Sequence, residues 1–174
     1  MRRVVFDSNA IDPVADTPGA YEVLENAVET GHLEILYTHV TVDELVAISD
    51  LERRAWLVLL MASLGRVVPT GDAAADFSRV NFCRVGADED EDVLEALRSG
   101  NIDHTRDALI AATARFEACP LVTNERRLAN RSRERGLEVL STRQLLAEFD
   151  FVIALGENLI HRFRRGSRSQ RRLP

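Results

Sequence analysis

Four acidic side chains occupy positions where alternating strands and helices could bring them together. Asp7 and Glu125 each follow a short apolar run typical of a buried strand, while Glu44 and Asp107 lie near the starts of helical segments. Carboxylate oxygens are the ligands that Mg²⁺ and Mn²⁺ prefer in proteins. A bound cation of this kind activates water and stabilises charge on a phosphate group. The four acids therefore predict metal-dependent hydrolysis of phosphodiester bonds.

Each acid also has a structural interpretation, and the residues alone leave both interpretations open. Asp7 could form a turn, and Thr41 with Glu44 has the spacing of a helix capping box. Asp103 and Asp107, four residues apart, could both lie at the positive end of a helix. Two like charges at that spacing cost stability unless a cation lies near them. One shared function explains the four acids more simply than four separate structural roles.

The hydrophobic pattern predicts strands that alternate with helices. We expect strands over residues 3–6, 32–37, 67–69, 120–123 and 137–140, and helices over 19–30, 38–48, 50–64, 72–82, 91–98, 103–118, 124–135 and from 143 onward. This order favours right-handed crossovers and a parallel sheet covered on both faces. The expected fold class is α/β, a three-layer α/β/α sandwich with a central parallel sheet. Ligands bind beyond the carboxyl ends of the strands in such sheets, which is where the acids fall.

The 174 residues suffice for one domain and a tail. We expect a nuclease-like domain over 1–148 and a helical extension over 149–174 with a flexible, arginine-rich end. Six of the 22 basic residues fall after Ile160 and none of the 28 acidic ones does, which leaves 16 basic against 28 acidic residues in the rest. Arg162, Arg164 and Arg165 in this tail are candidates for contact with RNA phosphates. The alternative is a solvated tail without a partner.

Composition excludes several other kinds of protein. The chain contains no lysine, and a P-loop nucleotide-binding site needs one. Receiver domains and haloacid-dehalogenase-like phosphatases, which also place an aspartate after the first strand, ordinarily use a lysine too. Its two cysteines stand outside any CxxC or Cys/His pattern, which argues against a zinc site. The longest apolar run, residues 55–64, is far shorter than the ~20 residues that span a bilayer, so we expect a cytoplasmic protein without a membrane segment.

The motifs resemble those of PIN-domain ribonucleases of the VapC-like toxin type. The four acids stand in segments that match the family in order and spacing, namely VVFDSNAID, THVTVDEL, DALIAATA and PLVTNERRL, and LEVLSTRQLL resembles the family's final strand and helix. The resemblance extends over about residues 3–147 and rests on all the motifs together, because each alone is a weak signal.

This resemblance implies an endoribonuclease dependent on Mg²⁺ or Mn²⁺, with an RNA substrate. The family's acidic positions correspond to Asp7, Glu44, Asp107 and Glu125, which would be both catalytic and metal-binding. Ser8, Asn9, Asp103 and Thr123 are candidates for side chains that orient these acids or an attacking water. Short bacterial proteins of this kind are often the toxin of a toxin–antitoxin pair, so the resemblance also implies a homodimer and a small antitoxin protein as partner.

Two positions depart from the family pattern. Glu125 stands where aspartate is usual, and Arg127 stands where a further aspartate is common, which leaves the number of metal ions open. Arg126 and Arg127 are instead candidates for binding an RNA phosphate. The altered positions also allow a second interpretation, in which the chain is a catalytically inactive PIN-like scaffold that binds RNA or a protein.

Overall fold

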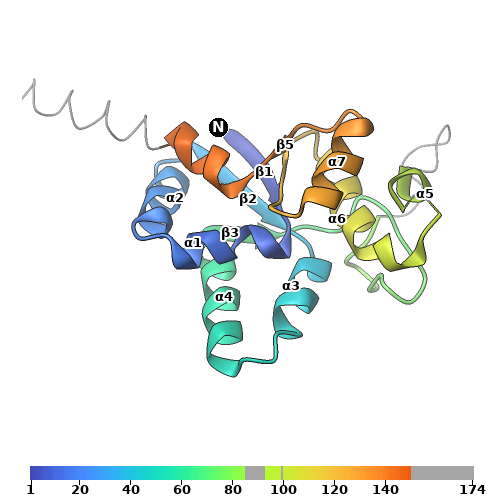
Figure 1. The fold of residues 1–174 in the computed structure, drawn as a ribbon, viewed down its shortest axis with the longest axis horizontal. Helices are drawn as coiled ribbons and strands as arrows, with labels where there is room; N and C mark the ends of the chain where they lie inside the picture. The colour runs from blue at the N-terminus through green and yellow to red at the C-terminus, as the bar shows by residue number, and fades with distance from the viewer. Residues whose placement is uncertain (85–92, 99, 150–174) are drawn as a thin grey trace, which may run out of the picture.

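A parallel five-stranded sheet lies at the centre of the computed structural model, which describes residues 1–84, 93–98 and 100–149 (Figure 1). The strands are β1 (Arg2–Phe6), β2 (Leu33–Tyr37), β3 (Gly65–Val67), β4 (Leu121–Val122) and β5 (Val139–Leu140). Their order across the sheet is β3-β2-β1-β4-β5, and every neighbouring pair is parallel. The chain therefore reverses its direction of winding between β1 and β4, which is the position where ligands bind in open α/β sheets.

Helices cover both faces of the sheet, which confirms the predicted three-layer α/β/α sandwich. They are α1 (Asp12–Asp16), α2 (Ala20–Glu29), α3 (His39–Val46), α4 (Leu51–Leu64), α5 (Val93–Arg98), α6 (Thr105–Phe116) and α7 (Arg126–Glu134), with short 3-10 turns η1 (Ser8–Ala10) and η2 (Ile102–His104). Residues 142–149 are also helical. None of the helices in these described ranges is long and apolar enough to cross a bilayer.

The central strand β1 feeds two separate apolar cores. Val4 and Phe6 pack with α1, α2, α4 and residues 142–149, whereas Val5 packs with α5, α6 and α7. This division follows from the geometry of a strand, in which successive side chains point to opposite faces of the sheet. All three side chains are fully buried, as expected of a strand covered on both sides. β1 is therefore held on both sides, and Asp7, which directly follows it, lies at the carboxyl end of the sheet.

The predicted helix over 72–82 is wrong, because residues 68–84 form an irregular loop against α6. Asp76 and Asn81 adopt positive φ angles of 67° and 69°, which a helix does not allow. Gly71 approaches α6 so closely that a Cβ atom there would lie 2.4 Å from the Ala112 carbonyl oxygen. Its backbone amide donates to the Thr113 hydroxyl at 3.0 Å. Tertiary contacts thus override the local helical preference of this segment.

Other differences are small or lie outside the described residues. The helix expected over 103–118 begins at Thr105, and η2 precedes it. Of the helix expected over 91–98, the part from Val93 is confirmed and the two preceding residues fall outside the described ranges. The extension expected over 149–174 lies outside them too, apart from its first residue.

Candidate metal centre

Asp7 is the most deeply buried acid among the described residues, with 2% of its surface exposed. It follows β1 directly, where its carboxylate accepts hydrogen bonds from the Ser8 backbone amide at 2.7 Å, the Thr123 hydroxyl at 2.7 Å and the Asn9 side-chain amide. Burial raises the pKa of Asp7 to about 6, against the hydrogen bonds, which lower it, and with the help of negative charge from Asp107 and Glu125. The Asp7 carboxylate is thus held in one orientation by neutral hydrogen-bond donors, while its neighbouring charges are negative.

Glu44 faces the same space from α3. Its carboxylate accepts a hydrogen bond from the Ser8 hydroxyl at 2.7 Å, so Ser8 connects the two acids through its backbone and its side chain. The pKa of Glu44 is raised to about 7, mainly by burial and also by the charges of Asp7 and Asp107, while the Ser8 hydrogen bond and the charge of Arg106 oppose the shift. A nearby cation would strongly stabilise the charged form of an acid in this environment.

The capping box of α3 does not use Glu44. Thr38 is the N-cap residue, and its side chain and that of Thr41 close the capping box. The structural interpretation of Thr41 and Glu44 as a capping pair is therefore wrong. The Glu44 side chain remains available for a role in the site.

Asp107 and Glu125 approach the other two acids from α6 and α7. Asp107 lies in the first turn of α6, and its charge acts on both Asp7 and Glu44. Glu125 is the N-cap residue of α7, makes no capping hydrogen bond with its side chain, and acts on Asp7 through its charge. The four acids predicted from the sequence therefore lie at one end of the sheet, where Asp107 acts on Asp7 and Glu44 and where Glu125 acts on Asp7.

The remaining candidates take different places. Asp103 lies in η2 and is exposed, so it does not share a face of α6 with Asp107 as the helical pattern predicted. Arg126 and Arg127 are exposed in the first turn of α7, directly after Glu125. Arg162, Arg164 and Arg165 lie outside the described residues. Thr123 and Asn9, by contrast, both contact Asp7.

A polar network that the sequence did not reveal supports the loop after β1. The Asn9 side-chain oxygen accepts from the Asn124 backbone amide at 2.7 Å, and the Asn124 side chain donates to the Asn9 carbonyl at 3.1 Å and to the Thr142 hydroxyl at 2.9 Å. The Thr142 hydroxyl in turn donates to the Ala10 carbonyl at 2.7 Å. These bonds join the ends of β1, β4 and β5, and the asparagines in the first and fourth acidic motifs, Asn9 and Asn124, were the available sequence signal.

The donor set fits a hard divalent cation. Asp7 and Glu44 offer oxygen ligands whose pKa values are raised mainly by burial and further by neighbouring acids, so that a cation would stabilise their charged forms. Within residues 1–84, 93–98 and 100–149, however, no three acidic, histidine or cysteine side chains stand close enough to form a ready metal site. Asp107 instead forms an ion pair of 2.7 Å with Arg131 of α7. The ligands are thus of the right kind, and Asp107 is engaged elsewhere.

Known proteins resemble this chain in structure. No protein-family model matches the chain, and no curated protein matches it. VapBC2 from Rickettsia felis, in a crystal structure with a DNA fragment from its promoter, matches with a TM-score of 0.52 and 17% identity over 80% of this chain and 98% of that one. The chain has a PIN-like fold. PAE2754 from Pyrobaculum aerophilum (16% identity, 86% and 97% covered, TM-score 0.46) and VapBC-1 from nontypeable Haemophilus influenzae (12%, 80% and 98%, 0.43) are further, looser matches.

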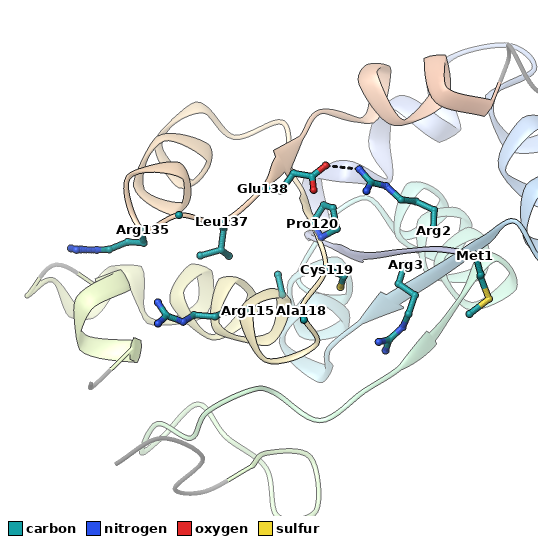
Figure 2. Close-up of a pocket in the computed structure, with 12 residues that line it drawn as sticks. Met1, Arg2, Arg3, Arg115, Ala118, Cys119, Pro120, Arg135, Leu137 and Glu138 are labelled. Atoms are coloured by element: carbon teal, nitrogen blue, oxygen red, sulfur yellow. Dashed lines mark hydrogen bonds and ion pairs between the residues drawn. The ribbon is translucent and has the colours of Figure 1, made fainter. Parts of the chain in front are cut away.

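A pocket of about 560 Å³ lies at the opposite, amino-terminal end of the PIN-like sheet (Figure 2). Four arginines are among the residues that line it, but Arg2 and Arg3 are already paired. Arg2 binds Glu138, and Arg3 binds Glu34 at 2.7 Å and Glu117 at 2.6 Å. The carboxyl ends of α6 and α7 also border the pocket, and such ends carry partial negative charge. This pocket is therefore a weaker candidate for a phosphate site than the acidic end of the sheet.

Proposed function

We propose that the chain is a metal-dependent endoribonuclease that hydrolyses RNA phosphodiester bonds, and that it is the toxin of a toxin–antitoxin pair. The observation that carries the proposal is the pairing of Asp7 and Glu44 through Ser8, at the point where the winding of the sheet reverses. Asp7 is buried and Glu44 is partly buried, and two such acids with raised pKa values at this place are costly to the fold; such sites are commonly functional.

Asp7, Glu44 and Asp107 would hold one Mg²⁺ or Mn²⁺ ion, with Glu125 assisting. A bound ion of this type supplies an activated water and neutralises charge that develops on the phosphate. Thr123 and Asn9 hold the Asp7 carboxylate, and Ser8 holds that of Glu44. Arg126 and Arg127, exposed beside Glu125, are placed to bind neighbouring RNA phosphates.

A small antitoxin protein is the expected partner, and a homodimer is the expected assembly. The partner is supported by the motif resemblance to VapC-like toxins and by the fold shared with the VapBC2 structure. As part of the same proposal, the protein acts on its RNA substrate in the cytoplasm.

A catalytically inactive scaffold is the second candidate. Arg127 replaces a commonly acidic residue, and Arg131 already neutralises Asp107. Both features would suit a protein that binds RNA without cleaving it.

Incubation of the purified chain with single-stranded RNA distinguishes the two. We expect cleavage in the presence of Mn²⁺ or Mg²⁺, none in the presence of a chelator, and recovery when excess metal is restored. Product lengths on a denaturing gel give the measurement. RNA binding without cleavage under every metal condition would select the scaffold.

Deletion of residues 161–174 is expected to weaken RNA binding, because it removes six arginines and no acid. Each phosphate contact that is lost lowers the slope of log affinity against log salt by about 0.7–0.9. Fluorescence anisotropy with a labelled RNA at several salt concentrations, in chelator so that no cleavage occurs, measures both effects. An unchanged slope would show that the tail makes no phosphate contacts.

A further inference from the structure

The ion pair between Asp107 and Arg131 carries an inference that rests on the proposed metal site and concerns its regulation. Arg131 Nη2 lies 2.7 Å from Asp107 Oδ2. The exposed fractions of the two side chains are only 16% and 23%, so water screens the pair weakly. It joins α6 to α7 beside the other acids, whose charges Asp107 already influences.

Arg131 is poorly satisfied in this position. Its Nε atom is buried and has no hydrogen-bond partner within the part of the chain that the structure describes. Arginine usually binds carboxylate through two parallel hydrogen bonds, whereas a single contact to Asp107 is found here. The guanidinium is therefore held mainly by the negative charge of the site and less by a complete set of hydrogen bonds.

We propose that Arg131 is an internal counter-cation that occupies Asp107 when no metal is bound and competes with the divalent ion for it. Asp107 must leave the guanidinium, or share its charge, before it can bind a metal. Arg131 thus lowers the affinity of the site for metal. In the metal-free protein, its positive charge offsets the repulsion among the carboxylates and so stabilises the fold. It is a positioning residue, since it acts through Asp107.

Mn²⁺ binding to Arg131→Met, measured by titration calorimetry without RNA, tests this competition. We expect Arg131→Met to bind Mn²⁺ about 10-fold more tightly than the wild type, a size typical of residues that contact metal ligands. Arg131→Gln, which keeps a hydrogen-bond donor and removes the charge, should bind more tightly as well. Arg66→Met is the matched control, because it breaks a 2.8 Å ion pair with Glu34, away from the acids, and should leave the affinity unchanged.

Thermal unfolding separates competition from a purely structural ion pair. In chelator, Arg131→Met should unfold at a lower temperature than the wild type, because Asp107 loses its counter-charge. Saturating Mn²⁺ should abolish or reverse this difference, whereas the loss of a structural ion pair would be the same with and without metal. Equal Mn²⁺ affinity of wild type and both Arg131 variants, or a deficit that Mn²⁺ leaves unchanged, would overturn the inference while the nuclease proposal stands. Failure of every variant and of the wild type to bind Mn²⁺ would instead refute the metal site and the inference with it.

Discussion

Replacement of Asp7 with asparagine is expected to reduce metal-dependent RNA cleavage by at least about 100-fold, because the site loses its most buried ligand charge. The variant should still fold. Asparagine has nearly the same shape, its oxygen can accept the bond from the Ser8 amide, and the Thr123 hydroxyl can rotate, so only the bond from the Asn9 side chain is lost. The loss should therefore appear in the cleavage rate and not in the circular dichroism spectrum. Initial rates with a short labelled RNA at saturating Mn²⁺ give the measurement.

Asp76→Asn is the matched control for this substitution. Asp76 is exposed and has a positive φ angle, which asparagine tolerates well. The Asp76→Asn variant should cleave RNA at the wild-type rate. If Asp7→Asn cleaves RNA as fast as Asp76→Asn, Asp7 has no part in the reaction and the proposed site is wrong.

Replacement of Glu44 with glutamine is expected to stabilise the metal-free protein at pH 8 by about 2 kcal/mol. Folding raises the pKa of Glu44 from 4.5 to about 7, mainly through burial, and each unit corresponds to about 1.4 kcal/mol before allowance for partial solvent contact. The folded protein holds this proton more tightly than the unfolded chain does. Wild-type stability therefore falls as the pH rises from about 4.5 to 7 and then levels, whereas glutamine has no charge to bury.

Urea unfolding in chelator at several pH values between 4.5 and 8 measures this difference. The increase in unfolding free energy from Glu44→Gln should be near zero at pH 4.5 and greatest above pH 7. The Ser8 hydrogen bond should not contribute to this increase, because Ser8 can donate equally to glutamine. Glu29→Gln, on the exposed end of α2, should show no gain that grows with pH. A Glu44→Gln variant that is less stable than wild type at pH 8 would contradict the view that this acid is a cost to the fold.

Local patterns predicted the fold because its strongest signals are local. Val4 to Phe6 form a short, continuous apolar run of the kind found in a strand covered on both faces, and the structure buries all three side chains. The failure over 72–82 has the opposite origin. Gly71 and Thr113, 42 residues apart in sequence, hold that segment to α6, and no local pattern records such a contact.

The sequence predicted the acids of the site better than their partners. Asp7 and Glu125 could be placed because each follows a strand, and parallel strands end at one edge of the sheet. Arg131 could not, since α7 contains several arginines with similar spacing and only tertiary packing brings one of them to Asp107. Asp103 was misplaced because the pattern could not distinguish η2 from the first turn of α6.

β1, which comes before the other four strands in this sequence, lies in the middle of the sheet. One neighbour of β1, β2, is close to it in sequence, whereas its other neighbour, β4, follows more than 100 residues later. Thr123, which orients Asp7, and Arg131, which balances Asp107, arrive only with that late segment. A chain without this later segment would therefore lack the residues that orient Asp7 and balance Asp107, so the proposed metal centre depends on both halves of the sequence.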